Sequence, residues 1–575
     1  MSIRRSIRVP SSMRSLLVLA AAGVACAPIA TGCASSAGES TGDQVDGLSG
    51  AQSSYVSDAV LGTLQLSPAM KGKTWNVTHD NSFGADWLLN TPMQPLWGKS
   101  VGTLVYPQPR TQNCDADFQL QHCSTQSDCT GGGTCAPVLA SVKKAGVAPI
   151  GMCVGHSDAQ VDEIYSLITS AQKFVDVTSL LPADGRYAAA IRNAITILSA
   201  RPTPPEVRII TGDYPIQGVV NTTTQLKSFT RDVPSSSNIR VAVGAFRSSD
   251  TSFSWNHSKI VAVDGKTAIV GGHNMWTQQY LMLDPVNDVS MVVRGSAAGD
   301  AHRFANQLWA YTCANMNWQT WLTWSVWENQ FENGSITSHC PAAFNLPTVE
   351  GPSSGTVISV GRLGTGIATN ANQADDARLA LIGAAKTTIR ITQQDIGPTT
   401  VPTLGLPLGS WPNDEIAALA NALVRGVDVY IILSNLNATA GGLPATQATY
   451  SNGWTPTDVG NHIKSTMQSN AGYPTDSALS TLLCSKLHLT SFRYGADDTW
   501  PDGTPFALHA KQIAIDGQAI YIGSHNMYSA NLQELGFIVD DSRVTADWIS
   551  KYWNNAWSNS ARVAVSGSET ARCAL

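Results

Sequence analysis

The sequence has few charged residues and no excess of basic ones. Only 14% of its 575 residues are charged, and 36 Lys and Arg stand against 42 Asp and Glu, so the formal net charge is −6. An average globular protein has about 25% charged residues. Binding to nucleic acid usually needs a clustered basic face. The composition therefore argues against a nucleic acid as partner.

Long hydrophobic runs are also missing after the first 33 residues. A helix that spans a membrane needs about 20 predominantly apolar residues, so a polytopic membrane protein is excluded. Hydrophobic residues still make up 43% of the chain, which excludes a mostly disordered protein. The 48 Gly, 28 Pro and 16 Trp are typical of a secreted protein that is rich in loops.

The first 33 residues have the pattern of an export signal. Arginines between residues 4 and 14 precede a short apolar stretch, Leu16 to Ala25, and small residues follow. Residues 30–33 resemble a lipoprotein cleavage box in which Cys33 is lipidated. Ordinary cleavage nearby and a twin-arginine signal are the alternatives. We expect a protein that is secreted, or anchored to the outer face of a membrane through Cys33, with residues 34–54 as a flexible tether.

Nine cysteines follow the export segment, and five of them lie within forty residues, beside three consecutive glycines at 131–133. Because export permits disulfides, we interpret the stretch around 111–155 as an insertion stapled by disulfides. A zinc site is the alternative, but paired C-x2-C units are missing. Since nine is odd, at least one thiol is free or pairs outside the chain.

The chain repeats a segment of twenty residues at a constant offset of 252 residues. The first copy runs from His257 to Trp276 and the second from His509 to Tyr528. The flanks repeat as well, because a helical pattern leads into a strand pattern twice in each half. These pairs lie at 161–168 and 174–178, 188–199 and 207–210, 374–384 and 388–392, and 415–424 and 427–432.

Alternating helices and strands favour an α/β fold with helices on the faces of a sheet. We divide the chain into halves at 55–345 and 346–575. When Lys173 is aligned with Lys386, the second half holds 39 extra residues before its motif. We expect these in a long loop near the site, in the Gly- and Thr-rich stretch around 438–454.

Each motif has a histidine and a lysine two positions apart on an apolar strand. Side chains alternate between the faces of a strand, so His257 and Lys259 point the same way, as do His509 and Lys511. Two such halves facing each other would place two imidazoles and two ammonium groups around one point.

Aspartate followed by glycine separates the two strands of each motif. Asp264 and Asp516 are candidate catalytic residues because they belong to the repeated motif. Asp-Gly between two β-rich runs is also a strong hairpin signal. For these two aspartates we favour turn geometry over direct chemistry.

Small residues and an asparagine follow the second strand of each motif. Small side chains let a bulky anion approach the backbone, and Asn and Ser can donate hydrogen bonds to its oxygens. The candidate binding residues are therefore Gly271, Gly272, Gly523 and Ser524, with the asparagines Asn274 and Asn526. His273 and His525, inside the same segments, are interpreted as bystanders.

This set of groups suits a phosphodiester. Paired Lys and Asn side chains would stabilise the charge that grows on the non-bridging oxygens in the transition state. A neutral imidazole can attack phosphorus while the opposite imidazolium protonates the leaving alkoxide. That group then acts as a base toward water or an alcohol. We expect no metal and no cofactor, since the cations are built in and no H-E-x-x-H or carboxylate cluster is present.

Each histidine also needs an acceptor for its other ring nitrogen. Asp288 lies on the strand after the first motif, and Glu534 lies at the matching place after the second. A carboxylate there would fix the tautomer and stabilise the imidazolium. We expect Glu534, whose side chain is one methylene longer than that of an aspartate, to act on the second histidine.

The duplicated H-x-K-x4-D motif resembles that of the phospholipase D superfamily. Segments such as Ser254–Lys259, Leu308–Cys313, Phe506–His509 and Tyr521–Ser524 are similar to the secreted bacterial phospholipases D typified by Streptomyces. The resemblance runs from about residue 66 to about 557. It implies two similar α-β-α sandwich halves, the phospholipase D fold, with one active site at their interface.

The resemblance also implies a function. The expected reaction is hydrolysis of phosphatidylcholine to phosphatidic acid and choline, with transfer to primary alcohols in place of water. By the same resemblance, His257 forms a phosphohistidine and His509 is the general acid. The substrate is then a phospholipid membrane surface, and we expect a monomer. Trp276, Tyr280 and Tyr450 fall where the family lines its headgroup pocket, with cation–π attraction or ordinary packing as their role.

The cysteines and a tryptophan repeat are two further features of the sequence. Cys313 and Cys340 fit a disulfide of a relative, whereas the usual partner of Cys484 is missing. Cys573 or an N-terminal cysteine could replace it. Tryptophans also recur every three residues from 318 to 327, which on a helix would favour buried packing over a ridge facing lipid.

Other functions stay open at this point. The same pair of motifs serves nucleases and sphingomyelinase-like phosphodiesterases of the superfamily. A surface lipoprotein that keeps the fold without turnover is a third possibility. The small number of lysines, 14 in a net-acidic chain, speaks against a nuclease.

Overall fold

The computed structural model describes the chain in segments that all lie in one compact unit, Leu48–Leu575. The described residues are 54–91, 122–123, 125, 127, 134–137, 151–154, 159–213, 221–246, 254–280, 285–315, 324–327, 330–332, 340–345, 355–368, 371–401, 406–408, 410–436, 438, 454–499, 505–528, 530–569 and 573–575.

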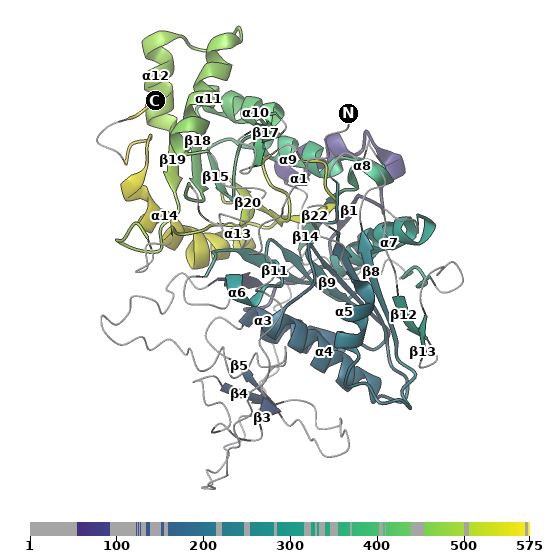
Figure 1. Ribbon diagram of the computed structural model, residues 1–575. Helices are drawn as coiled ribbons and strands as arrows, with labels where there is room; N and C mark the ends of the chain where they lie inside the picture. The colour runs from purple at the N-terminus through teal and green to yellow at the C-terminus, as the bar shows by residue number, and fades with distance from the viewer. Residues whose placement is uncertain are drawn as a thin grey trace, which may run out of the picture. The chain divides into compact units, whose positions relative to one another are not determined.

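Two large sheets organise the unit (Figure 1). In sheet order, the nine-stranded sheet holds β13 (Gln330–Glu332), β12 (Trp324–Trp327), β8 (Arg240–Phe246), β7 (Glu206–Gly212), β6 (Phe174–Ser179), β9 (Ile260–Val263), β10 (Thr267–Gly271), β11 (Val289–Arg294) and β2 (Leu88–Asn90). The eight-stranded sheet holds β1 (Trp75–Thr78), β14 (Thr356–Arg362), β22 (Glu534–Asp540), β21 (Ala519–Gly523), β20 (Lys511–Ile515), β15 (Thr388–Gln393), β18 (Asp428–Leu433) and β19 (Leu487–Ser491).

The two sheets share one topology. In the first, β6, β7 and β8 pair in parallel and β9, β10 and β11 follow as antiparallel neighbours. In the second, β15, β18 and β19 are parallel and β20, β21 and β22 are antiparallel. The predicted α/β fold with two similar halves is therefore confirmed.

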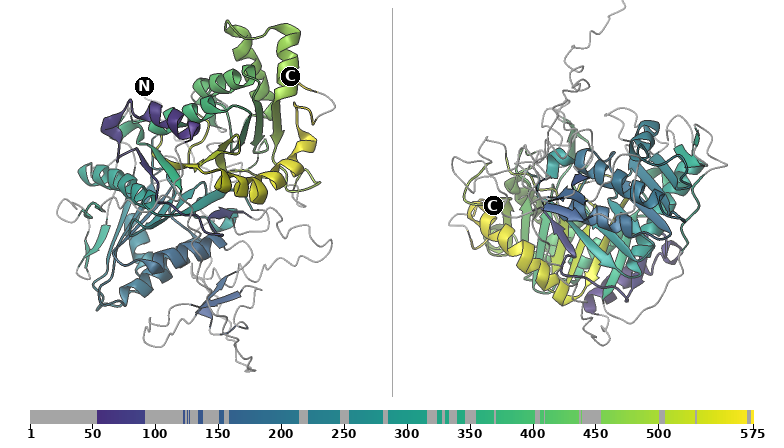
Figure 2. Two further views of the ribbon diagram at one scale, coloured as in Figure 1. Left: turned by 180° about the vertical axis from the view of Figure 1, so that it is seen from behind. Right: turned by 90° about the horizontal axis from the view of Figure 1, so that it is seen from below.

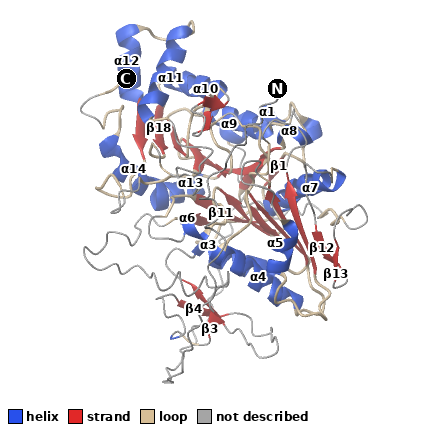
Figure 3. Cartoon of the chain, in the orientation of Figure 1, coloured by secondary structure: helices blue, strands red, loops and turns tan. Residues whose placement is uncertain are grey.

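Helices cover the outer face of each sheet (Figure 3). The first sheet packs against α3 (Ala159–Ser170), α4 (Gly185–Ser199) and α5 (Thr222–Phe229), which share an apolar core with it. The second packs against α1 (Tyr55–Leu64), α9 (Gln373–Ala384), α10 (Asn413–Val424), α11 (Pro456–Ser469) and α12 (Asp476–Lys486), with a core of their own. The remaining helices are α6 (Thr277–Tyr280), α7 (Ala297–Ala314), α8 (Gly364–Ile367), α13 (Ser542–Trp548), a π-helix (Ile549–Trp553), α14 (Asn554–Ser560) and two 3-10 turns (Pro68–Met70, Ala561–Val563).

A third apolar core lies between the two sheets and draws residues from both halves. Along β9, Val261 and Val263 pack with the outer helices, whereas Ile260 and Ala262 belong to this inner core. The alternation follows from the two-residue period of a strand. Each fully buried Val, Leu, Ile or Phe contributes about 1.5–3 kcal/mol, so the shared core holds the two motif hairpins in one place.

The N-terminal elements are divided between the sheets. Helix α1 packs into the core of the second half, and β1 pairs with β14 in antiparallel register, Trp75 opposite Val360. By contrast, β2 pairs with β11 in the first sheet. Residues 55–78 therefore belong structurally with the second sheet. The division of the chain into halves at 345/346 stays a prediction.

The extra length of the second half differs in part from our expectation. Two helices, α11 and α12, stand between β18 and β19, whereas the described residues between β7 and β8 in the first half form one helix, α5. Part of the insertion is thus helical and does not belong to one long loop. Residues 439–453 of the expected loop lie outside the described residues.

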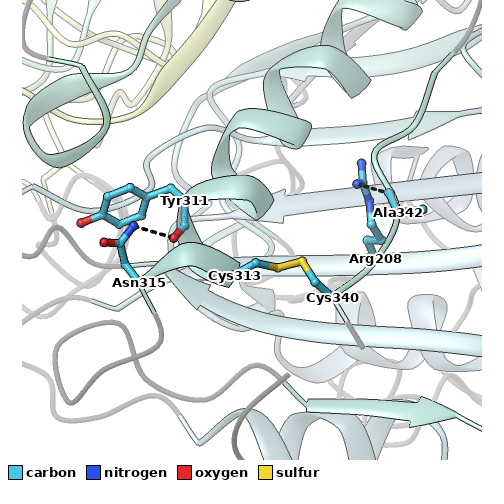
Figure 4. Close-up of a disulfide and its surroundings, with 6 residues drawn as sticks. All are labelled: Arg208, Tyr311, Cys313, Asn315, Cys340 and Ala342. Atoms are coloured by element: carbon cyan, nitrogen blue, oxygen red, sulfur yellow. Dashed lines mark hydrogen bonds between the residues drawn. A yellow bond between two sulfur atoms is a disulfide. The ribbon is translucent and has the colours of Figure 1, made fainter. Parts of the chain in front are cut away.

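Two disulfides join distant segments. Cys313, at the end of α7, bonds Cys340 (Figure 4), as the family resemblance implied. Cys484, in α12, bonds Cys573, one of the two alternatives left open. In the Cys-rich stretch the backbone forms a small sheet of β3 (His122–Cys123), β5 (Gly151–Val154) and β4 (Thr134–Pro137), while the pairing of its sulfur atoms lies outside the described residues.

The tryptophan repeat was interpreted as helical, and this was wrong for its described part. Trp324 and Trp327 bound the strand β12, which pairs with β8 and β13. Spacing by three cannot distinguish helix from strand in a short aromatic-rich run. A second small sheet is formed by β16 (Thr399–Val401) and β17 (Leu406–Leu408). Figure 2 shows the ribbon from behind and from below.

Candidate active site

The motif aspartates serve the hairpin turns, as we favoured. Asp264 and Asp516 both have φ of 53°, and the glycine after each also has positive φ, as in a type I′ turn. The Asp264 carboxylate accepts the backbone N–H groups of Gln172, Lys173 and Phe174 at 2.7–2.8 Å. The Asp516 carboxylate accepts those of residues 386–388 at 2.8 Å. Both lie at the end of the strand away from the histidine.

The backbone of each motif histidine is bonded to the other half of the chain. The N–H of His257 donates to the carbonyl oxygen of Gln533 at 2.8 Å. The N–H of His509 donates to the carbonyl oxygen of Asn287 at 2.7 Å. Gln533 and Asn287 stand directly before the two candidate carboxylates. The two halves therefore fix each other at the point where the chemistry is expected.

The carboxylates are exchanged between the halves. Glu534 Oε1 lies 2.7 Å from His257 Nδ1, and Asp288 Oδ2 lies 2.7 Å from His509 Nδ1. Our expectation that Glu534 acts on the second histidine was wrong. The backbone bonds above explain this, because each carboxylate follows the residue that binds the histidine of the opposite half. Sequence symmetry could not reveal this exchange.

These contacts set the tautomer of both rings. An ionised carboxylate only accepts hydrogen bonds, so Nδ1 carries the proton and Nε2 keeps its lone pair. Burial, and then the charge of Lys259, lowers the pKa of His257 to about 4 against the raising effect of Glu534. Burial, Lys511 and Lys259 hold the pKa of His509 well below its usual value. Both imidazoles are therefore neutral in the free protein near pH 7.

The two motif lysines are buried beside the histidines. Each ammonium donates to the carbonyl oxygen of the histidine two residues before it, for Lys259 at 2.7 Å. Burial lowers the pKa of Lys259 to about 7, and burial together with Lys259 holds the pKa of Lys511 well below its usual value. The charges of His257, His509 and both lysines act on one another. An anion bound between these two buried amines would stabilise their charged forms.

The two asparagines have unused hydrogen-bonding capacity. Asn274 is 1% exposed, and neither its side-chain nitrogen nor its side-chain oxygen has a hydrogen-bond partner among the described residues. Asn526 donates to the Tyr528 hydroxyl at 2.6 Å, while its oxygen has no partner. An unsatisfied buried polar atom costs about 1–3 kcal/mol. A bound ligand would recover this cost, and the role of both residues in binding an anion stays a prediction.

The small residues are also required by packing, and their expected role in binding an anion stays a prediction. A Cβ on Gly271 would lie 2.3 Å from Ser290 Cα, and one on Gly272 would lie 2.1 Å from Asp288 Oδ1. A Cβ on Gly523 would lie 2.6 Å from Gly536 Cα. These glycines let the hairpins approach the strands that carry the two carboxylates. Ser524 is likewise occupied, since its N–H and hydroxyl contact the backbone of β22.

Of the three aromatic candidates, Tyr280 lies against the histidine pair. Its hydroxyl donates to Asp288 Oδ2 at 3.1 Å, lies 3.3 Å from His509 Nδ1, and accepts the N–H of Asn274 at 3.3 Å. Trp276 is buried, with 7% of its surface exposed. Tyr450 lies outside the described residues.

Sequence reasoning missed the partner of Glu534. Arg362, at the end of β14, donates to Glu534 Oε2 and forms an ion pair with Asp375 at 3.1 Å. A charged residue that ends the apolar strand 356–362 was the available signal. The histidines interpreted as bystanders are held by hydroxyl groups, His273 by Ser290 at 2.9 Å and His525 by Tyr521.

The described segments contain neither a membrane-spanning helix nor a cluster of metal ligands. None of their helices is both long enough and apolar enough to cross a bilayer. Nowhere in the same segments do three His, Cys, Asp or Glu side chains gather as metal ligands would.

Known proteins match the second half of the chain and, in another comparison, 70% of its length. Residues 379–557 match the family described as "Cardiolipin synthase, PLD-like domain". Over 454 residues the chain is 31% identical to a protein named Phospholipase D from Streptomyces antibioticus, and the match covers 70% of this chain and 77% of that protein. The chain belongs to the phospholipase D family.

Membership of the phospholipase D family makes the protein a phosphodiesterase, and it confirms the resemblance seen in the sequence. Two solved structures are also similar to the chain. The phosphatidylserine synthase of Haemophilus influenzae Rd KW20 is 14% identical, with a TM-score of 0.47 and coverage of 71% of this chain and 86% of that chain. The phospholipase D family member Nuc of Salmonella typhimurium is 19% identical, with a TM-score of 0.18 and coverage of 32% and 85%.

Proposed function

We propose that this phosphodiesterase is a phospholipase D that hydrolyses phosphatidylcholine to phosphatidic acid and choline and transfers the phosphatidyl group to primary alcohols. One observation supports the chemistry most strongly. Two neutral imidazoles, two buried ammonium groups and the unsatisfied amide of Asn274 meet where the two halves join. Such a set can attack a phosphodiester and stabilise its transition state without a further group.

The roles of the two histidines follow from their carboxylates. Burial alone would raise the pKa of Glu534, but Arg362, His525 and His257 lower it well below its usual range. Burial raises the pKa of Asp288 despite nearby cations. A firmly ionised carboxylate holds the Nδ1 proton of His257 and leaves Nε2 as the nucleophile. His509, beside a carboxyl group that ionises less readily, exchanges protons as acid and base.

The reaction then proceeds in two displacements. The Nε2 atom of His257 bonds to phosphorus while the bond from phosphorus to the headgroup oxygen breaks. That oxygen takes a proton from His509, whose pKa rises when the anionic phosphodiester lies beside it. His509 next accepts a proton from water or an alcohol, whose oxygen attacks phosphorus. The bond from phosphorus to nitrogen breaks, which frees His257 and phosphatidic acid or its ester.

The neighbourhood of His257 favours a lipid over a nucleic acid. Trp255 and Leu532 form a small apolar cluster with Leu180, Leu181 and Ala530, which are partly buried. Trp255 stands two residues before His257. Trp255 and Leu532 are buried, so the accessible apolar surface here comes from Leu180, Leu181 and Ala530. Such surface fits the glycerol and acyl portion of a phospholipid, whereas a nucleic-acid backbone would need a basic groove.

For the headgroup we keep Trp276 and Tyr450 as candidates for cation–π contact with choline. We assign Tyr280 a different role, since its hydroxyl is bonded to Asp288. We further propose that the protein acts as a monomer on a phospholipid surface. Export, with lipidation at Cys33, would bring it to that surface, and mass spectrometry of the mature N-terminus would reveal the acyl chains.

The test is choline release from phosphatidylcholine vesicles by the wild type and by His257→Ala. We expect release by the wild type, phosphatidylbutanol in the presence of 1-butanol, and no release by the variant. Cleavage of DNA or bis-p-nitrophenyl phosphate without lipid turnover would indicate a nuclease-like phosphodiesterase. Absence of every activity would indicate a lipoprotein without turnover.

A further inference from the structure

The two catalytic carboxylates differ in what binds their second side. The second oxygen of Glu534 accepts a hydrogen bond from the guanidinium of Arg362. Arg362 also bonds both carboxylate oxygens of Asp375, at 3.1 and 3.2 Å, and the carbonyl oxygen of Leu532 at 3.3 Å. Glu534 is fully buried and Arg362 is 7% exposed. The guanidinium thus lies between a buried and a half-buried carboxylate.

Among the described residues, no arginine or lysine donates a hydrogen bond to the carboxylate of Asp288, as Arg362 does to that of Glu534. The backbone N–H of Val289 donates to its Oδ1 at 2.8 Å, and Tyr280 and His509 contact its Oδ2. A phenol and an amide N–H stabilise a carboxylate less than a guanidinium does. The inequality of the two pairs therefore arises outside the repeated motif.

We propose that Arg362 is a positioning residue that keeps Glu534 ionised and thereby keeps the proton of His257 on Nδ1, with Nε2 free to attack phosphorus. This proposal rests on the proposed role of His257 as nucleophile. Arg362 acts through Glu534 and does not touch the reacting atoms. It adds to the reaction a residue that lies on β14, 105 positions after His257 in the chain.

The charges around the pair decide the sign of the effect. Among the described residues, the groups whose charges act on Glu534 or His257 include Arg362 from β14, Lys259 beside β9, Lys511 of β20, Tyr521 of β21, His525 after β21 and His509 before β20. Asp375 of α9 lies on the other side of Arg362, with Arg378 of the same helix 3.6 Å from it. Without Arg362, the buried carboxylate loses the guanidinium bonded to it, and the Glu534–His257 pair binds its next proton more tightly.

The experiment compares Arg362→Met with Arg362→Lys. Methionine keeps most of the volume and removes the charge, whereas lysine keeps the charge. The readout is the pH dependence of kcat/KM for bis-p-nitrophenyl phosphate and for short-chain phosphatidylcholine. We expect Arg362→Met to move the acid limb upward by about one to three pH units, because an opposite charge in contact shifts a carboxyl group by that amount. Arg362→Lys should leave the limb in place.

Three further variants show whether Arg362 acts through Glu534. In Glu534→Gln no carboxylate can take up the proton. The acid limb should therefore be the same in Glu534→Gln and in the double variant Arg362→Met with Glu534→Gln. In Asp375→Asn the guanidinium still contacts Glu534, so the limb should stay where the wild type has it.

The chain offers a matched control for loss of a buried arginine. Arg208 binds Asp176 at 2.6 and 2.8 Å, and His302 Nδ1 lies 2.6 Å from the same carboxylate. Like Arg362, Glu534 and His257, this group joins an arginine, a carboxylate and a histidine, but its carboxylate is an aspartate and it lies among β6, β7 and α7. Arg208→Lys and Arg208→Met should lower thermal stability and leave the pH profile unchanged.

The outcomes separate this proposal from the proposed function. An unmoved acid limb in folded Arg362→Met, or an equal shift in Arg208→Met, would overturn the role of Arg362. If the wild type cleaves bis-p-nitrophenyl phosphate but not phosphatidylcholine, the lipid assignment fails, while the profile on the soluble substrate still decides the role of Arg362. Should Arg362→Met not fold, Arg362→Gln gives the same readout.

Discussion

The pair formed by Glu534 and His257 and the pair formed by Asp288 and His509 look alike in the sequence and differ in the structure. Both have an Nδ1–carboxylate distance of 2.7 Å, and both join the two halves. Glu534 is bonded to Arg362, whereas Asp288 is bonded to the hydroxyl of Tyr280. The repeat thus builds two similar histidine–carboxylate pairs. Residues outside the repeat, Arg362 and Tyr280, make the surroundings of the two carboxylates different.

The difference teaches that a duplicated motif need not work symmetrically. A nucleophile must be neutral and held by a fixed anion, whereas an acid–base group must gain and lose a proton during each cycle. The pKa of Glu534 is lowered and that of Asp288 is raised, which fits these two tasks in that order.

The largest predicted effect separates the two histidines. His257→Ala should lower kcat for phosphatidylcholine by about 10⁴-fold or more, because the nucleophile is lost. His509→Ala should cost about 10²–10⁴-fold, because the leaving alkoxide stays unprotonated. With bis-p-nitrophenyl phosphate the leaving group needs no acid. We then expect a burst of p-nitrophenol from His509→Ala and none from His257→Ala, measured by stopped-flow absorbance.

A burst from His257→Ala would contradict this division of roles. The double variant His257→Ala with His509→Ala serves as the background control.

The exchange of carboxylates predicts the next effect. Glu534→Gln should slow the burst by about 10²-fold, because it disturbs the tautomer of His257. Asp288→Asn should leave the burst rate within about threefold and slow steady turnover, since only the return of the proton through His509 is impaired. Rapid-quench kinetics with the soluble diester measures both steps. The opposite pattern would mean that each carboxylate serves the histidine of its own half.

The pH dependence is the third prediction. Attack needs neutral His257, whose pKa is about 4, so kcat/KM should fall as the pH drops below about 4. The anion site needs charged Lys259, whose pKa is about 7, so kcat/KM should fall again as the pH rises above about 7. The free protein sets both limbs. Initial rates measured between pH 3.5 and 9 at constant ionic strength test this prediction. A profile with a single limb, or with limbs far from pH 4 and pH 7, would contradict it.

Asp264→Asn should have the smallest effect on catalysis. Asparagine tolerates positive φ but offers a weaker acceptor to the three N–H groups, so unfolding should become easier by about 1.5–3 kcal/mol. The kcat of the folded variant should stay within about twofold of the wild type, as for other changes away from the site. Urea titration and saturation kinetics measure the two, with Asp516→Asn as the matched variant. A hundredfold loss of kcat would make this aspartate part of the chemistry.

Much of the fold could be predicted because it depends on local periodicity. The helix over 161–168 and the strand over 174–178 appear as α3 and β6, and Asp-Gly marks both hairpins. The disulfide between Cys313 and Cys340 was implied by the family resemblance, whereas Cys573 was one of two possible partners for Cys484. The strand β12 escaped prediction because the spacing of its tryptophans fits a helix as well.

The site residues could be named, but not paired. Side chains that meet across two halves are fixed by tertiary register, here the bonds from His257 to Gln533 and from His509 to Asn287. No local pattern carries that register. Arg362 was missed for the same reason, since its partner Glu534 lies 172 residues away.

The central claim is that His257, held by Glu534, forms the covalent bond to phosphorus. The most direct measurement is to quench His509→Ala during the burst with bis-p-nitrophenyl phosphate and to map the phosphorylated peptide by mass spectrometry at alkaline pH. The account predicts one nitrophenyl phosphoryl group on His257. A label on any other residue, or a burst without a covalent label, would contradict it.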